Sequence, residues 1–275
     1  MKNKMNQLDN PILCISVAEK PGKFGITVHN AGYRALGLNY IYKAFGITDI
    51  KGAVAGVRSL GIRGCSVSMP FKEKVIPFLD RLDPLAKKIG AVNTIVNQND
   101  CLIGYNTDVI AAQKSLQQLK ISNNNNIIIF GAGGVARAIL FALKNLKLKN
   151  ITITNRTISR GRKLAKEFNV DFIQWSKREN IHADVIINAT SIGMYPNISS
   201  SLISNNNIKN SQIVMDVVMP PKTKLINLAN RYQKISVDGL KLSLYQAFAQ
   251  FKLYTGRNPP VQVLEKAAKI LYKVK

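Results

Sequence analysis

Three polar side chains stand just after short apolar segments in the first part of the chain. Lys72 follows the apolar segment 64–68, Asn93 lies in the segment GAVNT, and Asp108 ends the segment YNTD. On loops of one sheet they could converge on a polyol, with Lys72 donating and accepting a proton and Asp108 holding it in place. The residues alone leave an alternative, in which Lys72 is a solvated side chain on a surface helix.

A glycine-rich turn follows the apolar run at 127–130. The turn consists of small residues: Gly131, Ala132, Gly133, Gly134 and Val135. With Ala136 they form the pattern G-x-G-x-x-A, which gives a tight turn, close approach to a pyrophosphate and close helix packing. The helix that starts here would offer free N–H groups to phosphates. This placement predicts a dinucleotide site, and a structural turn without a nucleotide is the alternative.

The end of the next predicted strand, 151–154, indicates which nucleotide binds. NAD sites carry an acidic residue there, which accepts from the ribose 2′-hydroxyl. This chain has no acid at that place but Asn155, Arg156, Thr157 and Arg160. Arginines bind a 2′-phosphate through directed N–H groups, and a helix N-terminus disfavours them unless an anion is near. The segment therefore favours NADP over NAD, with solvated arginines at a helix start as the alternative.

A polar turn with the sequence NATSIGM, which contains Thr190, follows a further apolar segment at 185–189. It is predicted to lie at the carboxyl edge of the sheet, where ligands of open α/β sheets bind. Taken alone, this turn could also be a polar connection without a ligand.

The elements that must position these residues alternate between strands and helices. In the first part of the chain we predict strands at 12–17, 40–45 and 64–68, and helices at 30–36, 50–60 and 71–78, the last starting just after Pro70. A helix at 109–119 and a polar run at 123–126 lead into strands at 127–130, 151–154, 185–189 and 213–217, with helices at 135–145, 159–168, 238–256 and 260–275. Such alternation predicts mostly parallel sheets with crossover helices, hence an α/β protein.

Composition narrows the class of protein. The 275 residues are 46% hydrophobic, which suffices for two modest cores. No apolar run approaches the roughly 20 residues of a membrane span, and residues 1–10 lack a signal peptide's apolar stretch. We therefore expect a soluble cytoplasmic protein with no membrane partner. The three cysteines have no CxxC or Cys/His spacing, which argues against a disulfide framework or a metal site.

The net charge of +24 could indicate a nucleic-acid partner. Such partners require clustered cations, whereas the lysines here are spread along the chain. We therefore expect a generally basic surface without nucleic-acid binding, which attracts small carboxylates and the phosphates of a nucleotide.

Together the motifs resemble those of the shikimate dehydrogenase family, in the family's order. They run from about Val28 to Ala247 and read SMPFKE, GAVNT, YNTD, GAGGVAR, NRTISR, NATSIGM and DGLKLSLYQA. The resemblance implies hydride transfer from NADPH that reversibly reduces 3-dehydroshikimate to shikimate. We expect a three-layer α/β substrate-binding domain, 1–107 completed by helices in 240–275, and a Rossmann NADP-binding domain at 108–239. Substrate would bind in the cleft, with Asp108 at the hinge.

The resemblance also implies roles for single residues. Lys72 and Asp108 would be the catalytic pair. The substrate's ring hydroxyls would be held by Ser68, Asn93, Asp108 and Gln246. NADP would be held by residues 131–135, residues 155–160 and Thr190, with Val218 and Gly239 near the nicotinamide.

Three departures separate this chain from the family's main pattern. The family's carboxylate-binding Ser-x-Ser is absent before His29, and the segment KFGIT stands there instead. Met219 replaces a tyrosine, and Lys241 and Leu242 replace a glycine and a methionine. The pattern looks most like the divergent shikimate dehydrogenase-like branch.

We hypothesise that Thr27 and Lys23 replace the two serines, supplying a hydroxyl and an ammonium group to the substrate carboxylate. A lysine binds as a point charge, so the substrate could be held less precisely or differ from shikimate. Two alternatives remain: a dehydrogenase of quinate or another cyclic polyhydroxy carboxylate, and a nucleotide-binding protein with little turnover. We expect a monomer or a homodimer.

Overall fold

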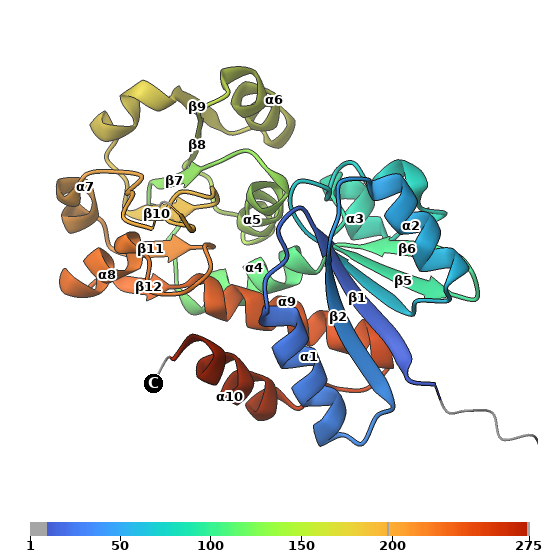
Figure 1. The fold of residues 1–275 in the computed structure, drawn as a ribbon. Coiled ribbons are helices and arrows are strands. Elements are labelled where there is room, and N and C mark those ends of the chain that lie inside the picture. The colour runs from blue at the N-terminus through green and yellow to red at the C-terminus, as the bar shows by residue number, and fades with distance from the viewer. Residues whose placement is uncertain (1–9, 197, 274–275) are drawn as a thin grey trace, which may run out of the picture. The chain divides into compact units, whose positions relative to one another are not determined.

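The computed structural model describes residues 10–196 and 198–273, which form two compact units. Unit 1 runs to Thr107 and resumes at Ala247, and unit 2 comprises Asp108–Gln246. Each unit contains one six-stranded sheet and its own hydrophobic core (Figure 1). The predicted α/β fold class is confirmed.

The sheet of unit 1 has the strand order β2-β1-β3-β5-β6-β4. Its strands are β1 (Ile12–Ala18), β2 (Tyr40–Gly46), β3 (Gly64–Val67), β4 (Arg81–Leu82), β5 (Thr94–Gln98) and β6 (Cys101–Tyr105). The pairings are parallel except that β5 runs antiparallel to both of its neighbours. The hairpin between β5 and β6 turns through Asn99 and Asp100, whose φ angles of 51° and 65° are those of a tight two-residue turn.

Helices cover both faces of this sheet, because side chains alternate along each strand. The helices are α1 (Phe24–Ala35), α2 (Ile50–Ser59), α3 (Pro84–Ile89), α10 (Val261–Tyr272) and the last part of α9 (Gly239–Thr255). In β1, Ile15 and Val17 pack in the core with α2, whereas Cys14 packs with Tyr33 of α1 and Phe251 of α9. Unit 1 therefore has three layers, and α1 lies beside α10 and β2 (Figure 1).

The prediction of a helix at 71–78 is wrong. The chain forms turns there, followed by a short 3₁₀ helix at Ile76–Phe78. Phe71 and Val75 are both buried and lie four residues apart, which is the spacing of apolar residues on one face of a helix. However, Pro77 has no N–H group for a helical bond, and the carbonyl oxygen of Lys72 accepts from Val92 instead (2.8 Å).

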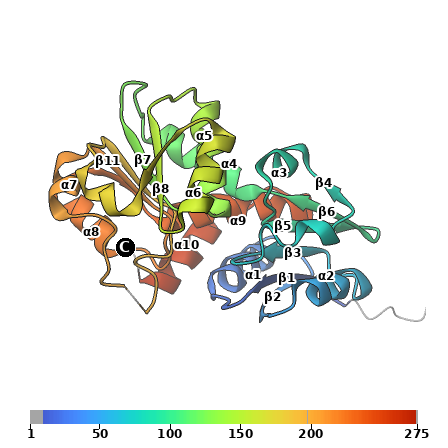
Figure 2. The same ribbon diagram turned by 90° about the horizontal axis from the view of Figure 1, so that it is seen from above.

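Unit 2 contains a fully parallel sheet with the order β12-β11-β10-β7-β8-β9. Its strands are β7 (Ile127–Phe130), β8 (Ile151–Asn155), β9 (Asp171–Gln174), β10 (Val185–Asn188), β11 (Ile213–Asp216) and β12 (Ile235–Val237). Its helices are α4 (Thr107–Gln118), α5 (Gly134–Asn145), α6 (Ile158–Phe168), α7 (Asn205–Asn210) and α8 (Lys224–Arg231), with a 3₁₀ helix at Trp175–Asn180. The core on one face includes α4, α5 and α6, and that on the other includes α7 and α8 (Figure 2). This is the doubly wound dinucleotide-binding topology.

The helix α9 is shared by both units. Its start belongs to unit 2, where Leu242 packs in the core, and its end from Ala247 onward belongs to unit 1. The domain boundary predicted from the sequence, at 239/240, lies at the start of this helix. The two units of the structure divide at 246/247, inside the helix. Among the described helices, none combines the length and the apolar character that a membrane span requires.

Candidate active site

The centre of the unit 2 sheet is a topological switch point. From β7 the chain proceeds to β8 and β9 on one side, then returns to β10 and β11 on the other. The loops that follow β7 and β10 meet there: a Cβ atom on Gly131 would lie 2.7 Å from the carbonyl oxygen of Ala189. Gly131 also has a φ of +115°, which other residues rarely adopt. Glycine is required at this position, and ligands of open α/β sheets bind at such an edge.

The start of α5 forms an open cradle beside this turn. Gly133 is the N-cap residue and makes no side-chain cap, so the first N–H groups of the helix need another partner. A Cβ atom on Gly133 would meet nothing within 4 Å, so the space in front of the helix is open. Ala136 is fully buried and lets α5 pack closely on the sheet. An anionic group such as a pyrophosphate fits this cradle.

The end of β8 carries two exposed arginines. Arg156 and Arg160 flank the start of α6, whose first turn contains no acidic residue. Asn155 is half-buried and donates from Nδ2 to the carbonyl oxygen of Thr157 (2.9 Å). Because β8 pairs with β7, these residues lie at the same sheet edge as the glycine turn. The edge suits a second phosphate group.

Two buried polar residues join the loops that follow β10 and β11. Asn188 donates from Nδ2 to Oδ1 of Asp216 (2.9 Å), and its Oδ1 accepts from the backbone N–H (2.9 Å) and the hydroxyl (2.8 Å) of Thr190. Asp216 also accepts from the N–H of Val218 (3.0 Å) and from the Thr223 hydroxyl (2.6 Å). The predicted cofactor contacts Thr190 and Val218 are thus held by one network. The only signal of this network in the sequence is the polar residue that ends each of these apolar strands, Asn188 in β10 and Asp216 in β11.

The Asp216 carboxyl is 1% exposed, and this burial raises its pKa from 3.8 to about 6, against the lowering effect of its three hydrogen bonds. The folded chain therefore favours the protonated acid. The stability that the protonated Asp216 carboxyl contributes is fully present below pH 3.8 and is lost as the pH rises through about 6.

We expect Asp216→Asn to remove this dependence, since an amide stays neutral. The free energy of unfolding of the variant minus that of the wild type should rise by roughly 2 kcal/mol between about pH 4 and pH 7. Urea unfolding of both proteins at the two pH values measures the difference. A difference that stays constant with pH would show that Asp216 ionises as it does in water.

Val218 and Gly239 also come together, as their predicted common role requires. A Cβ atom on Gly239 would collide with the carbonyl oxygen of Val218, so only glycine allows α9 to begin there. Val218 itself is 2% exposed.

In unit 1, backbone hydrogen bonds bring the turn after β3 next to Asn93. The N–H of Val92 donates to the carbonyl oxygen of Lys72 (2.8 Å), and the N–H of Val67 donates to that of Asn93 (2.8 Å). Lys72 and Ser68 are both half-buried. The predicted residues Ser68, Lys72 and Asn93 therefore share one edge of the unit 1 sheet.

Asn93 is fully buried and binds the start of α4. Its Oδ1 accepts from the backbone N–H of Thr107 (2.8 Å), and its Nδ2 donates to the Thr107 hydroxyl (2.9 Å). Asp108 is the next residue of the chain and is 4% exposed. Gln250 of α9, which the sequence reasoning missed, donates to Thr94 (2.9 Å) and Ser66 (3.1 Å) behind Asn93.

The remaining predicted substrate residues lie apart from these bonds. Lys23 is exposed at the N-cap of α1, and Thr27 is half-buried one turn later, its N–H donating to the Lys23 carbonyl oxygen (3.0 Å). Gln246 is half-buried in α9, one turn before Gln250. None of these three residues takes part in the hydrogen bonds around Asn93 and Gln250, so their substrate contacts stay predictions.

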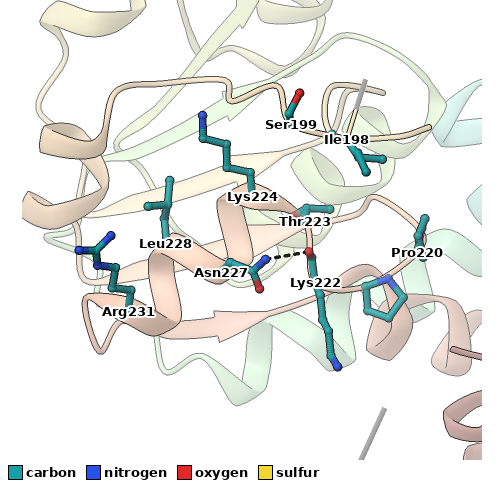
Figure 3. Close-up of a pocket in the computed structure, with 11 residues that line it drawn as sticks. Ile198, Ser199, Pro220, Lys222, Thr223, Lys224, Asn227, Leu228 and Arg231 are labelled. Atoms are coloured by element: carbon teal, nitrogen blue, oxygen red, sulfur yellow. Dashed lines mark hydrogen bonds between the residues drawn. The ribbon is translucent and has the colours of Figure 1, made fainter. Parts of the chain in front are cut away.

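A cavity of about 510 Å³ lies on unit 2, between the loop after β10 and the start of α8. Its lining includes three cations, Lys222, Lys224 and Arg231. Their side chains point in different directions and do not converge on one point (Figure 3). None of the predicted site residues lines this cavity.

Comparison with known families gives three matches along the chain. The model for the shikimate dehydrogenase substrate binding domain matches residues 24–95. The model for shikimate / quinate 5-dehydrogenase matches residues 111–242, and the model for the shikimate 5′-dehydrogenase C-terminal domain matches residues 239–269.

Similar proteins cover nearly the same length. A shikimate dehydrogenase-like protein of Haemophilus influenzae is 42% identical over 93% of this chain and 95% of its own. A shikimate dehydrogenase (NADP(+)) of Pyrococcus furiosus is 38% identical over 88% of this chain and 89% of its own. The solved structure of the Thermus thermophilus shikimate 5-dehydrogenase, in complex with NADP(H) and shikimate, has a TM-score of 0.83 and 28% identity, covering 94% of this chain and 98% of that one.

Proposed function

The chain belongs to the shikimate dehydrogenase family, and on that premise we propose that it catalyses the NADP-dependent, reversible reduction of 3-dehydroshikimate to shikimate. The observation that carries the proposal is the switch point of unit 2. There the glycine turn packs against the loop after β10, and the start of α5 faces open space. The relative from Pyrococcus furiosus, named an NADP(+) enzyme, supports the choice of nucleotide.

Cofactor binding is assigned to unit 2. Residues 131–135 would hold the pyrophosphate through backbone N–H groups at the start of α5. Arg156 and Arg160, with Asn155 and Thr157, would hold the 2′-phosphate, and the absence of an acid in the first turn of α6 supports NADP over NAD. Thr190, Val218 and Gly239 would lie near the nicotinamide.

The chemistry is assigned to Lys72 and Asp108. When bound, NADPH supplies the hydride that reduces the ring ketone. Lys72 donates a proton to the developing hydroxyl oxygen and accepts it again in the reverse reaction, and Asp108 holds the lysine in place. Ser68, Asn93, Asp108 and Gln246 position the ring hydroxyls, so that substrate orientation rests on uncharged donors as well as on the catalytic pair.

The test is a substrate panel followed by NADPH absorbance. Shikimate and quinate are each supplied with NADP and with NAD, and a reaction without acid gives the background. Turnover with shikimate and NADP at the highest kcat/KM supports the proposal. Tight NADPH binding without turnover of any acid would instead make the chain a nucleotide-binding protein.

Quinate, or another cyclic polyhydroxy carboxylate, is the second candidate substrate, and the description of the matching family model supports quinate. The matching family model covers shikimate and quinate dehydrogenases alike, and this chain replaces the carboxylate-binding serines by the segment that holds Lys23 and Thr27. A higher kcat/KM for quinate than for shikimate would establish this alternative.

Lys23→Ala is expected to raise KM for shikimate about tenfold, which is the range of one hydrogen bond to a charged group. The Kd for NADPH should not change, since Lys23 belongs to unit 1 and the nucleotide is assigned to unit 2. Steady-state kinetics and NADPH titration measure both quantities. The matched control is Lys20→Ala, an exposed lysine before α1. An unchanged KM in Lys23→Ala would remove Lys23 from the substrate site.

A further inference from the structure

Gln250 occupies a buried position behind the proposed substrate site of unit 1. It lies in the last part of α9 and is 3% exposed. Its Nε2 is within hydrogen-bond distance of the Thr94 hydroxyl (2.9 Å), the Ser66 hydroxyl (3.1 Å) and the Asn93 carbonyl oxygen (3.4 Å). One side chain thus connects α9 with the ends of β3 and β5.

The directions of the bonds around Asn93 follow from one backbone group. The N–H of Thr107 can only donate, so the Asn93 atom that lies 2.8 Å away is the oxygen Oδ1. The Thr94 hydroxyl, 2.9 Å from the same oxygen, must therefore donate to it as well. A hydroxyl has one hydrogen, so Thr94 must accept from Gln250, and Gln250 must present its NH₂ group.

A second contact fixes the other end of the Gln250 amide. His29 of α1 shares a side-chain hydrogen bond with Gln250, and its Nδ1 is without a partner among the described residues. Burial lowers the pKa of His29 to about 4, so the ring is neutral at neutral pH. Its N–H then donates to the Gln250 oxygen, which turns the NH₂ group toward Thr94. The ring is held by stacking on Tyr42, with ring centroids 4.5 Å apart.

These bonds end at the turn that carries Asp108. The Asn93 side chain acts as a cap for the first N–H of α4, which Thr107 begins. We propose that Gln250 is a positioning residue: through Thr94 and Asn93 it fixes the first turn of α4 and hence the backbone of Asp108. This inference rests on the proposed function only in its claim that Asp108 takes part in the reaction.

The first test follows the α4 cap without any turnover. Amide hydrogen exchange at Thr107, measured by NMR, should be about fivefold faster in Gln250→Met and in Thr94→Val than in the wild type, because either change removes a bond of roughly 1 kcal/mol. Both substitutions nearly conserve side-chain volume. Global stability is measured by urea unfolding and subtracted, and Gln262→Met on the exposed side of α10 is the control. Unchanged exchange in both variants would overturn the proposal.

The second test is a double-mutant cycle on kcat with the acid that the wild type oxidises. Each single variant should lower kcat about fivefold to tenfold, with the Kd for NADPH unchanged. The double variant should lose no more than the worse single variant, since both changes break one chain of bonds. Losses that multiply, or faster exchange with an unchanged kcat, would reduce Gln250 to a packing residue. If the wild type oxidises no acid, the proposed function fails, while the exchange experiment still decides whether Gln250 holds the α4 cap.

Discussion

Replacing Lys72 by alanine is expected to lower kcat by about 10²- to 10⁴-fold, which is the usual contribution of a positioned acid or base. The Kd for NADPH should stay the same, since the nucleotide is assigned to unit 2. The fold should also survive, because the bond from Val92 uses the backbone oxygen of Lys72, which alanine keeps. Single-turnover kinetics, NADPH titration and thermal unfolding together measure the three quantities.

Lys74→Ala is the matched control for this prediction. Lys74 lies two residues further along the same turn and is exposed, whereas Lys72 is half-buried. Both changes remove one positive charge from the same part of the surface, so a general electrostatic effect on an anionic substrate would appear in both. A fall in kcat that is equal in the two variants, or unfolding of Lys72→Ala, would contradict a catalytic role.

The second large effect is expected at the glycine turn, where two glycines are required for different reasons. In Gly131→Ala the new Cβ atom would stand 2.7 Å from the Ala189 carbonyl oxygen, at a φ of +115°. The strain should lower the free energy of unfolding by roughly 1–3 kcal/mol. Because the loop that holds the pyrophosphate must shift, we also expect NADPH affinity to fall by about 10²-fold, the order of loss that a displacement of about 1 Å causes at a positioned site.

Gly133→Ala should separate binding from stability. Its φ of −99° is ordinary, and a Cβ atom there meets nothing within 4 Å, so the melting temperature should not fall. The methyl group would, however, occupy the space assigned to the pyrophosphate, and NADPH affinity should fall as strongly as in Gly131→Ala. Calorimetry with NADPH and thermal unfolding distinguish the two variants.

A third glycine provides the control. Gly56 lies inside α2 of unit 1, and a Cβ atom there also meets nothing within 4 Å. Gly56→Ala should leave NADPH affinity unchanged and stabilise the protein by about 0.5–1 kcal/mol. Full NADPH affinity in Gly133→Ala would mean that the cradle at the start of α5 does not hold the nucleotide.

The sequence was most informative where one local pattern determines one element. The predicted strand at 127–130 is β7, because four consecutive buried apolar residues before a glycine turn have few other conformations available. The helix after it begins at Gly134, one residue before the prediction. The first helix begins at Phe24, six residues earlier than predicted, since Gly25 and Thr27 weaken its signal. The hairpin of β5 and β6 was missed, because its turn is Asn-Asp and lacks the usual glycine.

The site could be predicted only in its separate parts. The predicted strands place Thr190 and Asn93 at the edges of their sheets. The hydrogen bond between Asn188 and Asp216, however, joins residues that lie 28 positions apart in the sequence. The bond from Gln250 to Thr94 spans 156 positions. Such contacts depend on which strands are neighbours and on which face a helix packs, and no local spacing encodes them. The buried Asp216 carboxyl illustrates this, since its raised pKa follows from tertiary burial alone.

The division of α9 between the units has a consequence for the order of folding during synthesis. Unit 2 is continuous, so all of its strands have left the ribosome once Gln246 has emerged. The first segment of unit 1 is made before unit 2, but it lacks Phe251 and Tyr254, which pack on one face of its sheet, and α10, which packs on α1, until residues 251–272 have emerged. At about 5–20 residues per second, that apolar face is uncovered for several seconds or longer. The part of the chain synthesised first is therefore the part that completes its fold last, and a nascent chain stalled within α9 would present that face to chaperones.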